Sequence, residues 1–275
     1  MEEGTGQQVR AHIPAGAYLL DMRVRSYEVT RSGRITTATI LRYLEHLATQ
    51  ASAHRGYTHD WYERVGSAWV VRDIQLVFGR LPGLDDQLRM ATWLSDFRRV
   101  QAFREYAIWD RMTGRLITRA QARWAYVDRY RGVPLRIPDE LMRNFDAPGF
   151  PMKPHRLQQM NDRATMDTYE LTARAYEADS QQHINNCVYA DWLDEAERAA
   201  LRLDPASEPF TIVPRALRIE YIRSAQPGDH VRIETRSSRQ SRAIAATQEI
   251  RLNGNGTAVV RAESLRLVVP RCSRA

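Results

Sequence analysis

Apolar residues recur at spacings of three and four positions in two segments of the chain. In residues 36–51 they are Ile40, Leu44, Leu47, Ala48 and Ala51. In residues 185–203 they are Val188, Tyr189, Trp192, Leu193, Ala196, Ala200 and Leu203. This spacing places them on one face of an α-helix, so the pattern predicts a helix in each segment. The second helix should end before Asp204, because the following proline disfavours helix in the residue that precedes it.

Shorter segments alternate apolar and polar residues, which is typical of β-strands with two different faces. They come in pairs along the chain. Residues 74–78 match residues 217–221, and residues 88–90 match residues 231–233, at the offset that separates Phe78 from Tyr221. Two longer strands then close a hairpin in each half, one at the Met-Thr-Gly of residues 112–114 and one at the Asn-Gly-Asn-Gly of residues 253–256. Asn-Gly is a strong hairpin signal.

The two predicted helices follow segments that are copies of each other. Residues 27–37 align without a gap on residues 176–186. Threonine and asparagine are good N-caps, so residues 36–37 and 185–186 are expected to occupy the same helix entrance. A repeat of this length predicts two similar domains, each with a strand, a helix and about four antiparallel strands. The helix is expected to lie across the concave face of a curved sheet.

The repeat also predicts where the domains begin and end. We place the first domain at residues 15–130 and the second at residues 164–270. Residues 131–163 hold five prolines and little periodicity, so we interpret them as a linker.

One position distinguishes the two copies chemically. His183 stands where the first copy has Arg34. An imidazole, with an ordinary pKa near 6.5, is suited to proton transfer at neutral pH. A lone histidine near a helix start is also a common structural residue. The repeat favours the reading in which the second half reacts and the first half supports it.

Composition and charge narrow the class of protein. The chain has 275 residues and a formal net charge of +7, but its arginines are scattered and form no nucleic-acid motif. No segment has the length and hydrophobicity of a membrane span, and the acidic N-terminus is unlike a secretion signal. Cys187 and Cys272 make neither a disulfide framework nor a metal set. We therefore expect a cytoplasmic protein with no metal, no nucleic-acid partner and no membrane insertion.

Four further segments carry a family resemblance. They are residues 67–71 (Ser-Ala-Trp-Val-Val), the hairpin at residues 110–128, residues 136–140 (Arg-Ile-Pro-Asp-Glu) and residues 183–186 (His-Ile-Asn-Asn). In order and spacing they resemble the acyl-acyl carrier protein thioesterases of plants and bacteria, and the likeness runs from about Tyr18 to Val269. It implies an α+β fold of two tandem hotdog domains, each a long helix wrapped by a curved antiparallel sheet. It also implies hydrolysis of the thioester of fatty acyl-[acyl carrier protein], which releases a free fatty acid and ends chain elongation. No cofactor is implied.

The resemblance assigns the catalytic positions. The family motif Asp-x-Asn-x-His-Val-Asn-Asn falls on residues 179–186, with Asp179, His183, Asn185 and Asn186 matching. Gln181 replaces the family asparagine, and Ser224 stands where the plant enzymes have a glutamate. The implied catalytic set is His183, Asp179, Gln181, Asn185 and Ser224. We expect His183 to activate water and Asp179 to fix its tautomer. Backbone N–H groups at the helix entrance should bind the carbonyl oxygen as it gains charge.

The remaining expected sites concern binding. The acyl tunnel is expected beside the first helix and at the catalytic entrance, lined by Trp69, Tyr43, Leu44, Leu47, Met90 and Asn186. The implied partner is an acidic acyl carrier protein with a phosphopantetheine-linked acyl chain. Its docking is assigned to Arg215, Arg218 and Arg223, which are expected near the tunnel mouth. Ordinary core and surface roles are the alternatives for these residues.

Several alternatives stay open at the level of sequence. Glu195 is a candidate for the missing acid, although a solvated helix carboxylate fits it better, and Cys187 reads as a small core residue. The substrate is either carrier-bound or an acyl-coenzyme A. Gln181 and Ser224 favour a third reading, an acyl-binding protein without catalysis. A hotdog dehydratase also pairs aspartate with histidine, but it lacks His-Ile-Asn-Asn. The sequence predicts a monomer or a homodimer.

Overall fold

The computed structural model describes residues 13–145, 164–179, 181–202, 210–240 and 242–270. Ten strands form one antiparallel sheet in the order β1-β3-β4-β5-β2-β7-β10-β9-β8-β6. The first-half strands are β1 (Tyr18–Arg23), β2 (Ser67–Phe78), β3 (Gln87–Arg98), β4 (Gln101–Asp110) and β5 (Leu116–Asp128). The second-half strands are β6 (Thr165–Thr172), β7 (Phe210–Tyr221), β8 (His230–Gln240), β9 (Ala243–Leu252) and β10 (Ala258–Pro270). The helical elements are η1 (Ser26–Glu28), α1 (Thr37–His54), α2 (His59–Arg64), α3 (Asp139–Phe145), η2 (Ala175–Glu177) and α4 (Val188–Ala200).

The two halves repeat each other about the centre of the sheet. Each contributes five strands in the same internal order, and β2 pairs with β7 where they meet. In that pairing Gln75 lies opposite Arg218, and these two residues are also equivalent in the sequence repeat. A pseudo-twofold axis therefore passes between them. The predicted α+β fold of two tandem hotdog domains is confirmed.

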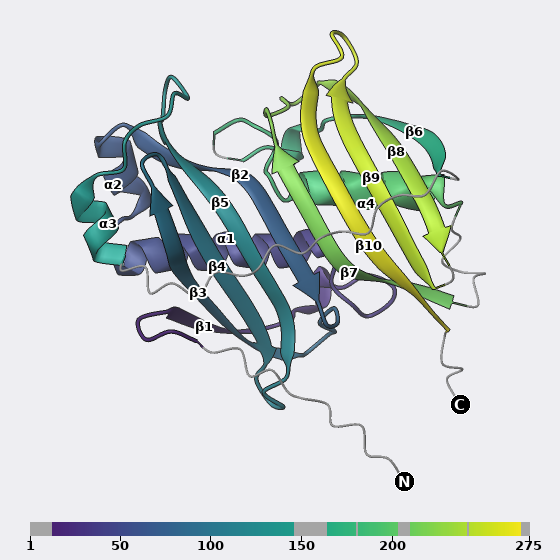
Figure 1. The fold of residues 1–275 in the computed structure, drawn as a ribbon, viewed down its shortest axis with the longest axis horizontal. Helices are drawn as coiled ribbons and strands as arrows, with labels where there is room; N and C mark the ends of the chain where they lie inside the picture. Colours follow the sequence, from purple (N-terminus) through teal and green to yellow (C-terminus); the bar gives the residue numbers. More distant parts are fainter. Residues whose placement is uncertain (1–12, 146–163, 180, 203–209, 241, 271–275) are drawn as a thin grey trace.

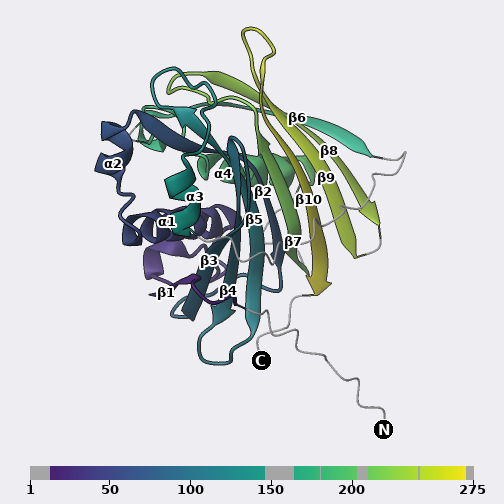
Figure 2. The ribbon, with the colours of Figure 1, turned by 60° about the vertical axis from the view of Figure 1, so that its left-hand side comes forward.

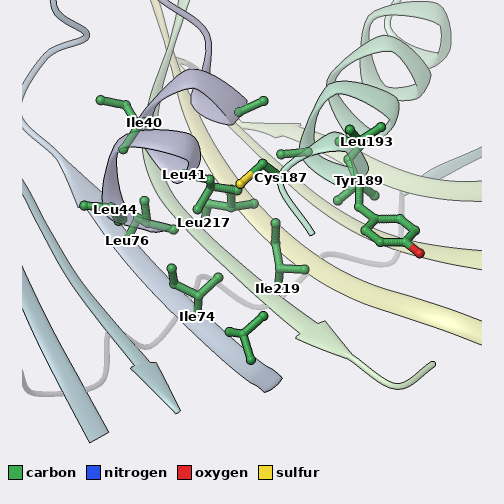
Figure 3. Close-up of a cluster of buried hydrophobic side chains, with 14 of the residues drawn as sticks. Ile40, Leu41, Leu44, Ile74, Leu76, Cys187, Tyr189, Leu193, Leu217 and Ile219 are labelled. Carbon is green, nitrogen blue, oxygen red and sulfur yellow. The ribbon is translucent and has the colours of Figure 1, made fainter. Parts of the chain in front are cut away.

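Both long helices lie on the same face of the sheet, and the sheet curves around them (Figures 1 and 2). The predicted helix of residues 36–51 is α1, and Thr36 is its N-cap, with its hydroxyl accepting from Thr39 N at 3.1 Å. The apolar stripes of the helices cover the apolar face of β2 and β7. Figure 3 shows Leu41 and Leu44 of α1, Leu193 of α4 and Cys187 just before α4, with Ile74, Leu76, Leu217 and Ile219 of the sheet.

The expected linker begins with a packed segment. In residues 131–145, the buried side chains of Ile137, Leu141 and Phe145 join a cluster with Tyr57 and Leu94 of the first half. The short α2 and α3 have too few turns to show a clear apolar period, which is why the sequence did not reveal them. Residues 146–163 of the expected linker lie outside the described residues, as does Cys272. Across the ranges that are described, no helix is both long enough and apolar enough to cross a membrane.

Candidate active site

The segment between η2 and α4 folds into a tight turn, which we call the second-half loop (residues 178–187). Ala178 and Ile184 form a bridge at its base, and Asp179 N donates to His183 O at 2.8 Å. Gln182 has a φ of 62°, in the left-handed region, where the equivalent first-half residue is Gly33 at 70°. The hydrogen bonds hold Gln181 and Gln182 at the tip of the loop.

Asp179 acts on this loop rather than on the histidine ring. Its Oδ1 accepts from Gln181 N at 2.8 Å. The expected contact between its carboxylate and the ring of His183 is absent from the described hydrogen bonds, because the turn directs the carboxylate back onto its own backbone. His183 is half-buried, and its backbone oxygen is held by Asp179 N. Asp179 therefore shapes the segment that carries His183.

The entrance of α4 offers an unpaired donor. Asn185 Oδ1 accepts from Cys187 N at 2.8 Å, and Asn185 N donates to Glu177 O at 3.0 Å. Tyr221 Oη donates to Asn186 O at 3.1 Å. Among the described residues, nothing accepts from Asn186 N–H. A free N–H at the positive end of a helix is suited to bind an oxygen that gains negative charge.

A cavity of about 330 Å³ lies in the first half, against this loop. That volume falls in the range of small-molecule sites. Its lining residues from α1 and α2 and the turn between them are Glu45, Ala48, Thr49, Ser52, Ala53, Tyr57, Thr58, His59 and Tyr62. Those from the strands and later segments are Ala68, Trp69, Leu94, Ala102, Arg104, Trp124, Arg129 and Phe145. The second half adds Gln181. The cavity of one half thus reaches the loop of the other.

The structure places the residues of the expected tunnel lining in different surroundings. Trp69 lies in the cavity wall, but Leu44, Leu47 and Met90 are fully buried in the core. Leu44 and Leu47 lie on the face of α1 that packs against the sheet. The cavity is lined by the adjacent face of the same helix. Tyr43 lines a different hollow of about 570 Å³, where its hydroxyl donates to Glu28 at 2.6 Å. Although larger, that hollow includes none of residues 178–187.

The expected docking arginines do not line the cavity. Arg218 pairs with Asp73 at 2.9 Å, and it alternates with Leu217 and Ile219, so it lies on the sheet face opposite the helices. Arg215 donates to the backbone oxygen of Phe78 at 2.7 Å. These contacts place both at the β2–β7 junction rather than at the cavity mouth.

The remaining candidates lie at the edge of the site. Arg223 and Ser224 are exposed, and neither lines the cavity. Asn186 contributes its backbone rather than a lining side chain. Glu195 is exposed on α4, and Cys187 is buried, as expected of a core residue. The apolar pattern of the sequence did not indicate the polar members of the wall, above all Glu45 and Arg104, because they lie outside the apolar stripe.

In the second half, charged side chains occupy the space that is equivalent to the cavity. Ala48 and Glu45 correspond to Glu197 and Asp194 in the repeat, and the strand registers equate Trp124 with Arg266. Arg266 forms salt bridges with Asp194 and, at 2.8 Å, with Glu197. The two halves have therefore diverged into one with a cavity and one with a partly buried ion-pair network.

Solved structures of similar architecture support the description of the fold. An acyl-ACP thioesterase from Bacteroides thetaiotaomicron is similar with a TM-score of 0.72 and 19% identity, covering 91% of this chain and 98% of that one. The 12:0-ACP thioesterase from Umbellularia californica is similar with a TM-score of 0.73 and 21% identity, covering 92% and 94%. At these identities the likeness concerns the fold.

Sequence comparison gives the family. A palmitoyl-acyl carrier protein thioesterase of Cuphea hookeriana is 27% identical over 187 residues, which cover 63% of this chain and 45% of that protein. An oleoyl-acyl carrier protein thioesterase of Coriandrum sativum is 23% identical over 256 residues, covering 87% and 67%. The chain spans about half the length of most curated relatives that it matches. Residues 17–145 match the acyl-ACP thioesterase N-terminal domain and residues 160–265 the C-terminal domain, so the chain belongs to the acyl-ACP thioesterase family.

Proposed function

We propose that this protein hydrolyses the thioester of a fatty acyl chain carried by an acyl carrier protein, releasing the free fatty acid. The observation that carries this proposal is the meeting of the two halves. The cavity of the first half is bounded by Gln181 at the tip of the second-half loop, and the same loop presents the N–H of Asn186, from which no described residue accepts.

The residues of the loop have separate tasks in this proposal. The acyl chain enters the cavity beside Trp69, and the thioester carbonyl accepts from Asn186 N–H at the positive end of α4. Gln181 orients the carbonyl or the attacking water, and His183 transfers a proton. Asp179 and Asn185 hold the loop through the backbone bonds that they accept. Ser224 binds a water at the position where the plant enzymes have a glutamate.

Thiol release from a panel of acyl-carrier substrates tests the proposal. We expect the wild type to release thiol and His183→Ala to be slower by at least about 100-fold, the usual effect of losing acid–base help. Ser224→Glu places a carboxylate where the plant enzymes have one and shows whether that position is productive here. Thiol release by none of the substrates would overturn the proposal, and near-normal rates in His183→Ala would remove this histidine from it.

Two other assignments are separated by the same assay. A higher kcat/KM for acyl-coenzyme A than for carrier-bound chains would favour an acyl-coenzyme A thioesterase. Retention of the acyl ligand without thiol release would indicate an acyl-binding protein. The net charge of +7 suits an acidic carrier protein, since an acidic partner is attracted to a basic surface, and the encounter rate should then fall with added salt. A cytoplasmic location stays a prediction, to be tested by cell fractionation.

A further inference from the structure

One carboxylate in the cavity wall comes from the supporting half and contacts the second-half loop. Glu45, in the third turn of α1, lies with Oε2 at 3.4 Å from Asn185 Nδ2 and at 3.2 Å from Cys187 Sγ. It also lines the cavity, as does Gln181 at the loop tip. Glu45 therefore lies between the cavity and the helix entrance, where the N–H of Asn186 has no acceptor among the described residues.

The described hydrogen-bond partners of Glu45 carry no positive charge. The amide of Asn185 and the thiol of Cys187 are neutral donors, and no salt bridge reaches this carboxylate within the described ranges. Burial raises the pKa of Cys187 well above its ordinary value, and the nearby charge of Glu45 raises it further. The thiol thus remains protonated and donates to Glu45.

The repeat shows that this lack of a salt bridge, among the described residues, is specific to the first half. Asp194 occupies the equivalent position on α4 and forms a salt bridge with Arg266. In the first half the place of Arg266 is taken by Trp124, which lines the cavity and cannot neutralise an acid. Asp194 is therefore held in a salt bridge, whereas Glu45 lines the cavity and forms no salt bridge with any described residue.

The position where the family resemblance placed a glutamate offers no such group. Ser224 is exposed and does not line the cavity. Glu195, the other acid considered from the sequence, is exposed on α4. Glu45 is the cavity-lining carboxylate among the described residues.

We propose that Glu45 is a catalytic residue of the thioester hydrolysis proposed above, and that it acts as the base on the attacking water. As the water oxygen bonds to the thioester carbon, one water proton passes to the Glu45 carboxylate and the carbonyl electron pair moves onto oxygen, which Asn186 N–H binds. When this intermediate collapses, the C–S bond breaks and the sulfur takes a proton from protonated His183. A proton then moves from Glu45 to His183 through solvent and restores both groups. Water and thioester become a carboxylic acid and a thiol.

The decisive variant is Glu45→Gln, which keeps the shape of the side chain and removes the base. We expect kcat for thiol release from an acyl-carrier thioester to fall at least about 100-fold, with KM changed by less than about threefold. Glu45→Asp should retain part of the activity. Glu195→Gln, an equal charge change on the exposed face of α4, should stay within about twofold of the wild type. Thermal melting and binding of a non-hydrolysable thioether analogue should be preserved in Glu45→Gln.

A second variant separates a chemical role from a structural one. Glu45→Ala removes the carboxylate and leaves space beside Asn185. Added formate should then raise its turnover in proportion to concentration, while leaving the wild type and Glu195→Ala unaffected. A contribution to packing alone would not respond to formate.

The outcomes separate the two proposals. Normal kcat in Glu45→Gln with an active wild type would overturn the role of Glu45 and leave the hydrolase assignment standing. A change in KM alone, or a slow Glu45→Gln with a lowered melting temperature and no formate rescue of Glu45→Ala, would also overturn it. An inactive wild type on every thioester would overturn the hydrolase assignment and, with it, this mechanism.

Discussion

Arg42 and Asp191 occupy equivalent places in the two halves of the chain and form a salt bridge with each other, with 2.7 Å between Arg42 Nη2 and Asp191 Oδ2. They lie where α1 passes α4, as Gln75 and Arg218 meet at the centre of the sheet. In a symmetric pair of identical halves, residues near the axis face their own copies. Two arginines or two aspartates there would repel, so divergence of the halves turned this contact into an attractive one.

Removing Arg42 should change the titration of Asp191 more than the stability of the protein. Burial raises the pKa of Asp191, and the hydrogen bond and charge of Arg42 oppose that rise. In Arg42→Ala the pKa should rise further, as NMR titration of this carboxyl would measure. A carboxyl whose folded pKa exceeds its unfolded value of 3.8 favours folding while it is protonated. Arg42→Ala should therefore lose stability, relative to the wild type, as the pH rises through that folded-state pKa.

The energetic contribution of this pair should be small at neutral pH. Its side chains are 47% and 38% exposed, and such pairs contribute about 0–1 kcal/mol. A double-mutant cycle with Arg42→Ala and Asp191→Ala, followed by urea unfolding, should give a coupling in that range that shrinks in high salt. A coupling of several kcal/mol would show that the halves depend on this contact far more than its exposure implies.

In contrast to the exposed Arg42–Asp191 pair, the ion-pair network of the second half should contribute strongly to the free energy of unfolding. The Glu197 side chain is 3% exposed, and Arg266 pairs with both Glu197 and Asp194. Burial alone would lower the pKa of Arg266, but the two carboxylates outweigh it and raise the pKa. Arg266→Met leaves both acids without their cation, so we expect a loss of about 3–5 kcal/mol in the free energy of unfolding, measured with urea.

A matched control keeps that experiment interpretable. Replacing Arg266, Asp194 and Glu197 together by Met, Leu and Met removes every buried charge of the network. Such replacements are often neutral or stabilising, by about 1–4 kcal/mol. We therefore expect the triple variant to recover most of the stability lost in Arg266→Met. A triple variant as unstable as the single one would mean that the network is required for packing rather than for charge balance.

The sequence predicted the parts of the fold that repeat. The three- and four-residue spacing located both long helices, and the offset from Phe78 to Tyr221 matched the strands β2 and β7 that meet at the centre. It did not reveal α2 or α3, because six and seven residues are too few to display a helical period. Burial of Phe145 against Tyr57 is a tertiary contact that no local pattern encodes.

The candidate site was predictable only where it is local. Residues 179–186 form one turn, so their proximity follows from the sequence. Glu45 reaches Asn185 across the two halves, and that contact depends on how α1 lies beside the second-half loop. Which face of α1 lines the cavity depends on packing in the same way. Leu44 and Leu47 follow the apolar stripe into the core, whereas the cavity takes Glu45 and Ala48 from the adjoining face.

Cys187 should resist alkylation in the native protein. Burial raises the pKa of its thiol, and the neighbouring Glu45 carboxylate raises it further, so little thiolate forms at neutral pH. We expect iodoacetamide to label Cys187 at least about tenfold more slowly in the folded protein than in urea, because each pKa unit removes tenfold of the thiolate. Mass spectrometry of the peptide that contains Cys187 measures this rate separately from Cys272. Rapid native labelling would contradict the buried, protonated thiol.

The length of acyl chain that the protein accepts should depend on Ala48. This residue lies in the cavity wall between Glu45 and Ser52, and the equivalent second-half residue, Glu197, belongs to the network that fills the matching space. Ala48→Leu adds three carbon atoms to the wall, so the preferred chain should become shorter by roughly three carbons, at a cost of overpacking of about 1–3 kcal/mol.

Trp69→Ala should enlarge the cavity and shift the preference toward longer chains. Ala199→Leu, an equal change on the exposed face of α4, should leave the profile unchanged. Thiol release across a series of chain lengths measures all three variants. Identical profiles for Ala48→Leu and Trp69→Ala would show that the acyl chain occupies another part of the protein.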